Sequence, residues 1–463
     1  MAFVQRVYSL VWGPPTLVLI LGVGIYFSLR TGFLQLRLLP KALGDFFRRM
    51  LGKGKGLDGV SSFQAVCTAL AATVGTGNLA GVAGAIAIGG PGSIFWMWVC
   101  GIFGMIIKCA EATLAIRYRE KSDNGEYVGG PMHMIQNGLS KRFRPLAGLY
   151  AFFGVVAAFG VGNATQMNTV ISAVCDTALA FGYSFPQWGK LVLGILLAVV
   201  VGMMLLGGVQ RIGRTAELLV PFAAGLYLIL CFAVLVLRYD AIPGAFDAII
   251  RGAFQPSAVT GGMIGSFAAA LRTGVSRGVF TNEAGMGTAS IAHASANVCH
   301  PVEQGLMGIA EVFFDTLVIC TMTALVILIS GVSIPYGTDA GIFLTGAAFA
   351  NVLGSWVNIL ISVSLCLFAL ATVLGWGLYG LRCAQYLLGD GALRWFALLQ
   401  TVVVVIACVL QAETVWILAE IINGLMAIPN LIALWALTPE FLNLYKSYLH
   451  GGTYENFHQC KSL

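Results

Sequence analysis

Charged residues are scarce in this chain. Only 10% of its 463 residues are Asp, Glu, Lys or Arg, whereas 58% are hydrophobic. A soluble domain carries roughly 25% charged residues, because its surface must be hydrated. This chain lacks the side chains for such a surface, so its composition excludes a water-soluble globular protein and predicts a membrane protein.

Residues and motifs that build catalytic and metal centres are also few. The chain has five histidines, and its eleven cysteines include no C-x-x-C pair. There is no Walker motif, which excludes an ATP-driven pump for this chain alone. The Gly75-x-Gly77-x-x-x-Gly81 spacing follows no predicted strand, which argues against a dinucleotide site. We therefore predict no enzyme, no bound cofactor, no metal centre apart from a transported ion, and no nucleic-acid partner.

Apolar runs of about 18–25 residues separate the few charges, and this length crosses a hydrocarbon core of roughly 30 Å. We predict an all-α integral membrane protein of about eleven transmembrane helices in a lipid bilayer. The first apolar run lacks the cleavage site of a signal peptide and is counted as a helix of the mature protein. The expected helices begin near Leu10, Phe63, Ser93, Leu146, Lys190, Thr215, Ser257, Gly305, Phe343, Trp395 and Thr414.

Lys and Arg are unevenly distributed over the predicted loops. If the basic loop after the first helix lies in the cytoplasm and the later loops alternate, roughly five times as many Lys and Arg residues face the cytoplasm as face outward. This is the positive-inside bias. It predicts an N-terminus outside the cell and a C-terminus in the cytoplasm, with the chain in a bacterial inner membrane.

Two predicted helices contain a polar, Gly-rich stretch at mid-depth, at residues 71–81 and 278–287. Glycine costs about 1 kcal/mol in a helix interior, so both stretches are expected to be unwound. Because they lie five helices apart, we predict two five-helix repeats of inverted topology, each opening with a broken helix. The repeats cover residues 59–240 and 241–440, after an extra helix and basic loop at 1–58 and before a cytoplasmic tail at 441–463. Secondary transporters with a midplane site have this organisation.

A broken helix exposes unpaired N–H groups on one side and unpaired C=O groups on the other. The N–H ends favour a carboxylate, and the C=O ends favour a cation or an ammonium group. Two facing breaks could therefore bind a zwitterion. The alternative is that these glycines only permit close helix packing.

Six motifs support a family resemblance that runs nearly end to end. They are TVGTGNLAG at 73–81, GGPGSIFWMW at 89–98, GGPM at 129–132, GVFTNEAGMG at 278–287, TVLGW at 372–376 and NGLMAIPN at 423–430. Together they resemble the alanine or glycine:cation symporter family of the amino acid–polyamine–organocation superfamily. The resemblance implies a five-plus-five leucine-transporter-type fold after one extra helix. It also implies uptake of alanine or glycine with sodium or, less often, with protons.

The resemblance also implies site residues by position. The substrate contacts would be Thr73, Gly75, Thr76, Gly77, Asn78, Gln166, Phe280, Thr281, Asn282, Gly285, Met286 and Trp376. The cation ligands would be Ala72, Gly75 and Thr372. Gln166 could instead make a helix–helix hydrogen bond, and Trp376 could be an ordinary packing residue. The family pattern has a Ser-Thr pair where this chain has Ala371-Thr372, so we expect weak sodium coupling or proton coupling in its place.

Ionisable groups inside membrane helices are functional candidates by default. Lys108 and Glu111 lie one helical turn apart and are expected to pair. Glu283 is expected to pair with Arg277 and to hold the second break open. Asp315 falls near the midplane, where it could carry a proton or cap the backbone of an unwound segment, and we favour capping.

We considered three other classes of protein. A channel would need a repeated filter loop or a ring of charges, and the sequence has neither. A membrane enzyme would need a nucleophile with its base or a metal cluster. A receptor with a transporter fold would bind amino acids without moving them. The sequence favours a secondary active transporter that moves a small neutral amino acid (alanine, glycine or serine) into the cell with sodium, by alternating access.

Overall fold

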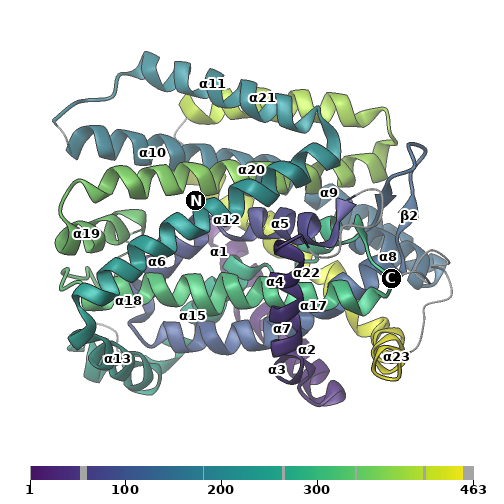
Figure 1. The fold of residues 1–463 in the computed structure, drawn as a ribbon, viewed down its shortest axis with the longest axis horizontal. Coiled ribbons are helices and arrows are strands. Elements are labelled where there is room, and N and C mark those ends of the chain that lie inside the picture. The colour runs from purple at the N-terminus through teal and green to yellow at the C-terminus, as the bar shows by residue number, and fades with distance from the viewer. Residues whose placement is uncertain are drawn as a thin grey trace.

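The computed structural model describes residues 2–52, 60–180, 182–262, 266–338, 341–409 and 413–451. Nearly all of them are helical, and most of the long helices run side by side along the longest axis of the molecule (Figure 1). The expected boundary at residue 58 and the end of the expected tail, residues 452–463, lie outside the described residues.

Thirteen α-helices lie among the described residues between 2 and 254. They are α1 (Ala2–Val11), α2 (Pro14–Thr31), α3 (Leu34–Arg37), α4 (Leu39–Met50), α5 (Ser62–Thr73), α6 (Val82–Gly89), α7 (Ser93–Arg117), α8 (Pro131–Gly138), α9 (Arg144–Phe159), α10 (Thr165–Ala180), α11 (Gln187–Leu205), α12 (Gly208–Leu237) and α13 (Ile242–Phe254).

The second half has the same character. Its α-helices are α14 (Pro256–Val259), α15 (Phe267–Asn282), α16 (Thr288–His293), α17 (Pro301–Val312), α18 (Thr321–Ile329), α19 (Gly341–Leu353), α20 (Val357–Leu388), α21 (Ala392–Val409), α22 (Glu413–Ala436) and α23 (Thr438–Leu449).

Three segments with the wider turn of a π-helix interrupt the long helices. They are η1 (Gly77–Gly81), η3 (Gly160–Ala164) and η5 (Phe313–Cys320). Two short 3₁₀ turns, η2 (Lys141–Phe143) and η4 (Tyr239–Ala241), lead into α9 and α13. Single π turns occur often at functional sites, because the extra residue re-aims neighbouring side chains.

Four two-residue strands are the exception to the helical fold. Strand β1 (Val60–Ser61) pairs in parallel with β4 (Ala296–Asn297), which ties the start of α5 to the segment after α16. Strand β2 (Glu120–Lys121) pairs antiparallel with β3 (Tyr127–Val128) in a hairpin after α7. Both pairs lie outside the long apolar helices.

The described residues contain seven helices that are long and apolar enough to cross a membrane, or nine if each of two bent helix pairs is one span. The predicted count of eleven and the inverted repeat stay predictions. Two expected helices are divided in the structure. The first is split between α1 and α2, because Pro14 and Pro15 follow Gly13 and cannot continue the preceding helix. The ninth is split into α19 and α20, with a left-handed Gly354 between them.

Both predicted helix breaks are present. The first separates α5 from η1 and α6, and the chain bends there by 51°. The second separates α15 from α16, with positive φ angles at Glu283, Gly285 and Gly287. Residues of α15 contact both η1 and α6, and residues of α16 contact α5, so the two broken helices lie against each other.

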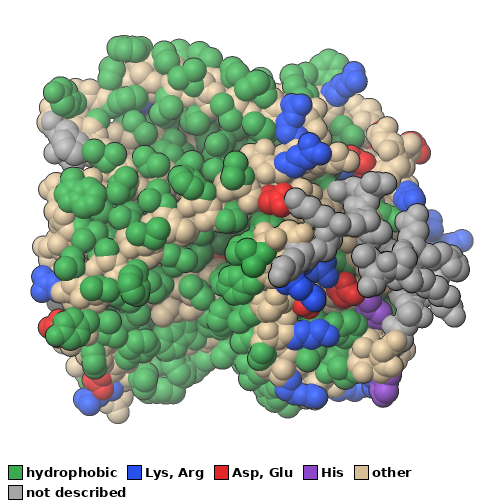
Figure 2. Space-filling view, in the orientation of Figure 1, with side chains coloured by type: hydrophobic (Ala, Val, Ile, Leu, Met, Phe, Trp, Pro, Cys, Tyr) green, Lys and Arg blue, Asp and Glu red, His purple; other side chains and the backbone are tan. Residues whose placement is uncertain are grey.

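The surface agrees with a membrane environment. Hydrophobic side chains cover most of the visible face, and basic side chains gather at the end of the molecule where β2, α8 and α23 lie (Figures 1 and 2). Large apolar side chains are exposed along α11 and α12, including Leu196, Leu218 and Ile229. A membrane-facing surface requires such exposure, whereas water would penalise it.

Candidate functional site

A small cavity lies where the two broken helices meet η3, α10, α20 and α22. Twelve residues line it: Ala72, Thr73, Gly75, Thr76, Gly77, Val161, Gln166, Phe280, Glu283, Thr372, Trp376 and Asn423. The cavity is small, with room for one or two water molecules.

The first break is held by the Asn78 side chain. The Gly75 N–H donates to Asn78 Oδ1 at 2.8 Å, so the side chain replaces a missing backbone acceptor. Asn78 Nδ2 in turn donates to Asp315 Oδ1 at 2.7 Å and to the Asp315 carbonyl at 3.1 Å. Asp315 therefore secures the unwound segment through the Asn78 side chain and not by bonding its backbone directly, so the choice between capping and proton transfer stays a prediction.

The second break is held by Glu111, which lies on α7. Its Oε1 accepts hydrogen bonds from the N–H groups of Gly285 at 3.0 Å and Gly287 at 3.1 Å. Asn430 Nδ2 donates to the same oxygen at 2.7 Å and to the Gly285 carbonyl at 2.9 Å. Both glycines have positive φ angles, which a side chain with a Cβ rarely adopts. A carboxylate from another helix thus takes the place of the missing helical turn.

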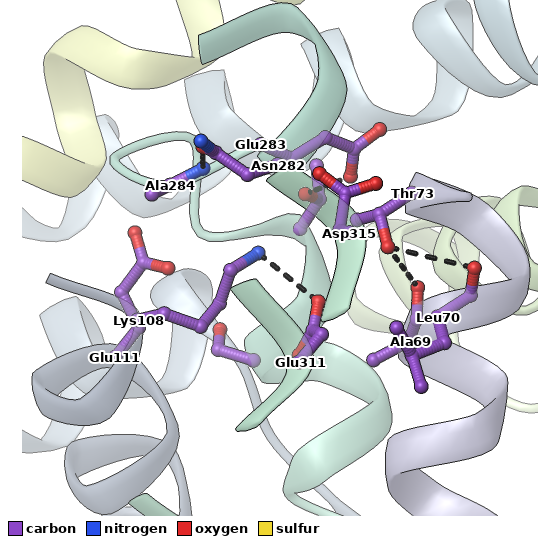
Figure 3. Close-up of polar contacts among 12 residues, drawn as sticks. Ala69, Leu70, Thr73, Lys108, Glu111, Asn282, Glu283, Ala284, Glu311 and Asp315 are labelled. Atoms are coloured by element: carbon purple, nitrogen blue, oxygen red, sulfur yellow. Dashed lines mark hydrogen bonds and ion pairs between the residues drawn. The ribbon is translucent and has the colours of Figure 1, made fainter. Parts of the chain in front are cut away.

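The expected pair of Lys108 with Glu111 is wrong. Lys108 Nζ lies 3.4 Å from Glu311 Oε1 on α17, and His293 Nε2 lies 2.8 Å from Glu311 Oε2. Figure 3 shows Lys108 and Glu111 on one helix, with Lys108 joined to Glu311 on its neighbour. Lys108 and Glu111 lie one turn apart on α7, which is why the sequence pairs them. The packing of α7 against α17 instead gives Lys108 a partner on the neighbouring helix. The side chains of Lys108, Glu311 and His293 are fully buried.

Glu283 ends α15, and its contacts also differ from expectation. It has φ 53°, a left-handed conformation that is rare outside glycine. The expected pair with Arg277 is replaced by two hydrogen bonds: Trp376 Nε1 donates to Oε1 at 3.1 Å, and the Thr288 hydroxyl donates to Oε2 at 2.6 Å. The left-handed turn carries the carboxylate off the helix surface on which Arg277 lies and into the cavity wall.

Two comparisons with known proteins identify the kind of molecule. Residues 1–459 match the model of the "Sodium:alanine symporter family". The chain belongs to this family. Among its relatives, "Sodium/alanine symporter AgcS" of Methanococcus maripaludis is 43% identical, over 96% of this chain and 97% of that protein. "Probable sodium/glutamine symporter GlnT" of Bacillus subtilis is 39% identical, over 95% of this chain and 89% of that protein.

A solved structure agrees on the fold. The crystal structure of MhsT in complex with L-phenylalanine has a TM-score of 0.55, with 16% sequence identity, and the match covers 85% of this chain and 100% of that one. Identity this low shows the fold alone, and it confirms the leucine-transporter type. This sodium:alanine symporter family member is therefore a multi-pass membrane transporter that couples amino-acid movement to a cation, and it is not an enzyme.

Nine of the fourteen residues expected to contact substrate or cation line the cavity of this symporter: Ala72, Thr73, Gly75, Thr76, Gly77, Gln166, Phe280, Thr372 and Trp376. The other five do not line it: Asn78, Thr281, Asn282, Gly285 and Met286.

Those five residues make contacts that hold the two breaks in place next to the cavity. Asn282 Oδ1 accepts from the Ala284 N–H at 2.9 Å, and the Met286 carbonyl accepts from the Tyr150 hydroxyl at 3.0 Å. Thr281 bonds to the Gly278 carbonyl of its own helix at 2.9 Å. Asn78 and Gly285 carry the capping contacts described above. The residue types of the two breaks thus predicted where the cavity lies. Some of these residues line the cavity, and the others hold the two breaks in place.

Three lining residues were missed as ligand contacts: Val161, Glu283 and Asn423. Asn423 had a usable signal, because it is an uncharged polar side chain inside an apolar run. It is 1% exposed, and neither its Oδ1 nor its Nδ2 has a hydrogen-bond partner among the described residues. Gln166 donates to the Val161 carbonyl at 3.2 Å, while its Oε1 has no partner in the same part of the chain.

The expected cation ligands lie where α20 packs on α5. A Cβ atom placed on Gly75 would lie 2.8 Å from Thr372 Oγ1, and one placed on Gly375 would lie 2.8 Å from the Ala72 nitrogen. The Thr372 hydroxyl donates to the Phe368 carbonyl at 3.0 Å, so its oxygen lone pairs remain available to a ligand. Neighbouring Ala371 is buried and has no side-chain oxygen.

Proposed function

We propose that this symporter carries alanine, glycine or serine into the cell together with sodium. The observation that carries the proposal is the cavity between the two helix breaks, lined by backbone of Gly75 and Gly77 and bounded by Phe280 and Trp376. Gly77, the first residue of η1, has a backbone N–H that can bind a substrate carboxylate. No cofactor is required, because the ion gradient supplies the energy.

The small size of the substrate follows from the two aromatic walls. Trp376 is fully buried, and Phe280 lies against Gly77, whose added Cβ would be 3.5 Å from its ring. Glutamine is the competing substrate, because the relative from Bacillus subtilis is named a probable sodium/glutamine symporter. A larger amide side chain would require Trp376 and Phe280 to move apart.

Coupling to sodium is proposed through Ala72, Gly75 and Thr372. Sodium prefers about five or six oxygen ligands, and Ala371 cannot provide one. Proton coupling is the second candidate, because this missing oxygen weakens the proposed sodium site.

The deciding experiment is uptake of radiolabelled alanine into proteoliposomes under separately imposed sodium and pH gradients. Uptake driven by an inward sodium gradient at equal pH supports the proposal, and glycine and serine should compete whereas glutamine should not. Uptake driven only by the pH gradient would establish proton coupling in its place. Saturable binding without uptake under either gradient would make the protein a receptor and contradict the proposal.

The proposed orientation in a bacterial inner membrane places the N-terminus outside and the C-terminus in the cytoplasm. It rests on the excess of Lys and Arg in the loops assigned to the cytoplasm. In intact cells, a membrane-impermeant reagent should label an N-terminal tag and should reach a C-terminal tag only after permeabilisation. Labelling of both tags in intact cells would contradict an odd number of spans.

A further inference from the structure

Glu283 is the one residue with an ionisable side chain among the twelve that line the cavity. It is 3% exposed, and two neutral donors, Trp376 and Thr288, hold its carboxylate. Neither donor carries a charge. Lys108 is the positive side chain whose charge acts on Glu283, but it is paired with Glu311. A carboxylate fixed in this way costs free energy in a buried site unless a positive group accompanies it.

The other buried carboxylates near the breaks are engaged elsewhere. Glu311 faces Lys108 and His293, and Glu111 accepts three N–H donors. Asp315 accepts from Asn78 and from the Thr316 hydroxyl at 2.8 Å. None of these three lines the cavity. Glu283 is therefore the side chain that can balance a positive charge on the transported molecules.

The charge of the transported molecules requires such a partner. A neutral amino acid is a zwitterion with no net charge, and one coupled cation raises the total to one positive charge. A single carboxylate in the wall makes the loaded cavity neutral, which lowers the cost of enclosing the charges in a medium of low dielectric constant.

The position of Glu283 favours the ammonium end of the zwitterion. Glu283 lies at the C-terminal end of α15, where the unpaired carbonyl groups of a helix favour positive charge. Gly77 at the start of η1 also lines the cavity and can offer its N–H to the carboxylate end. Two polar side chains add independent support. Gln166 and Asn423 line the cavity, both are buried, and Gln166 Oε1 and Asn423 Oδ1 have no hydrogen-bond partner among the described residues.

We propose that the Glu283 carboxylate binds the α-ammonium group of the substrate, with Gln166 and Asn423 supplying further acceptor oxygens. This inference rests on the proposed amino-acid substrate and deepens it. It assigns Glu283 to substrate recognition, in addition to its place at the end of α15. It also predicts that the transporter discriminates strongly against compounds that lack the ammonium group.

The test compares L-alanine with L-lactate, which carries a hydroxyl in place of the ammonium group, in titrations of purified protein at fixed sodium. In the parent, alanine should bind far more tightly than lactate. In Glu283→Gln, which keeps the size of the side chain, alanine affinity should fall roughly 100-fold. Lactate affinity should change little, so the alanine-to-lactate ratio should collapse. Asp247→Asn removes an exposed carboxylate on α13 and should leave both affinities unchanged.

Two outcomes would overturn the inference. If Glu283→Gln weakened alanine and lactate by the same factor, the residue would act only on the shape of the cavity. If the ratio persisted while sodium affinity fell, the carboxylate would serve the coupled cation. Glu283→Asp, which keeps the charge, should retain the preference for alanine and tests the same point should the glutamine variant fail to fold. A parent that binds no alanine, glycine or serine would instead refute the proposed function, before any variant is compared.

Discussion

Trp376 combines two roles that a substitution can separate. Its indole N–H bonds to Glu283, and its ring forms one wall of the cavity. Trp376→Ala should admit larger substrates such as leucine and should weaken alanine binding. Each methylene accommodated is worth roughly 1–3 kcal/mol of discrimination. Competition of unlabelled amino acids against alanine uptake measures this change.

Trp376→Phe is the matched control, because it keeps an aromatic wall but removes the N–H donor. Its size selectivity should resemble that of the parent, while its alanine affinity falls through the weakened hold on Glu283. A selectivity profile in Trp376→Ala that equals the parent's would reduce Trp376 to a packing residue.

Ala371 is the position where this chain departs from the family's cation-site pattern. A serine here would add an oxygen beside Thr372, and a buried polar partner is worth about 1–3 kcal/mol, which is roughly 5- to 150-fold in affinity. Ala371→Ser should therefore tighten the sodium dependence of uptake by a factor in this range. Ala384→Ser, which adds the same hydroxyl about three and a half turns further along α20, should not. Tight, obligatory sodium activation in the parent that Ala371→Ser leaves untouched would contradict this account of the site.

At the scale of elements, each helix break is held by a side chain from the helix that follows the other break. Helix α7 follows the first break, and its Glu111 caps the second. Helix α17 and η5 follow the second break, and Asp315 of η5 holds the first through Asn78. The two breaks are thereby coupled through the packed pair α7 and α17, which also encloses the Lys108–Glu311 pair.

Removing one of these braces should loosen its own break. Glu111→Leu would leave the N–H groups of Gly285 and Gly287 without a partner, at a cost of about 1–3 kcal/mol for each unsatisfied group. We expect a lower thermal unfolding temperature for the detergent-purified protein and a loss of alanine uptake. Glu111→Gln keeps an acceptor oxygen and should be clearly milder. Equal stability of the parent and the leucine variant would show that Glu111 does not hold the break.

At the scale of the whole molecule, His133 links stability to pH. It lies on α8, outside the long apolar helices, and is 6% exposed. Burial lowers the pKa of His133 to about 4. The Glu120 carboxylate, whose Oε2 lies 3.9 Å from His133 Nε2, opposes this shift, and Arg382 adds a smaller lowering. In the unfolded chain the same imidazole titrates near its ordinary pKa of about 6.5.

Because the unfolded state binds the His133 proton more readily, folding stability should fall as the pH drops from about 6.5 towards 4. The loss attributable to this group is at most about 3 kcal/mol. The difference in unfolding temperature between parent and His133→Asn, measured from pH 7.5 to 4.5, isolates it from other acid effects. The parent should lose more stability than the variant over this range. Parallel curves would show that His133 is protonated in the folded protein as well.

Local properties of the chain determined much of this picture. The length of the apolar runs determined that the protein is a membrane protein, since a hydrocarbon core selects for length and apolarity alone. The glycines and polar side chains at 73–81 and 278–287 predicted both helix breaks, because they weaken a helix wherever it packs. The motifs around Gly75, Phe280 and Trp376 indicated residues that do line the cavity.

The partners of the buried charges were decided only by the tertiary structure. A sequence places a side chain relative to its neighbours three and four residues away on the same helix, so it paired Lys108 with Glu111 and placed Glu283 beside Arg277. The packing of α7 against α17 instead placed Lys108 beside Glu311, and Glu283, in a left-handed conformation, bonds to Trp376. These contacts join segments up to two hundred residues apart. Their geometry depends on how whole helices pack, which no local pattern encodes.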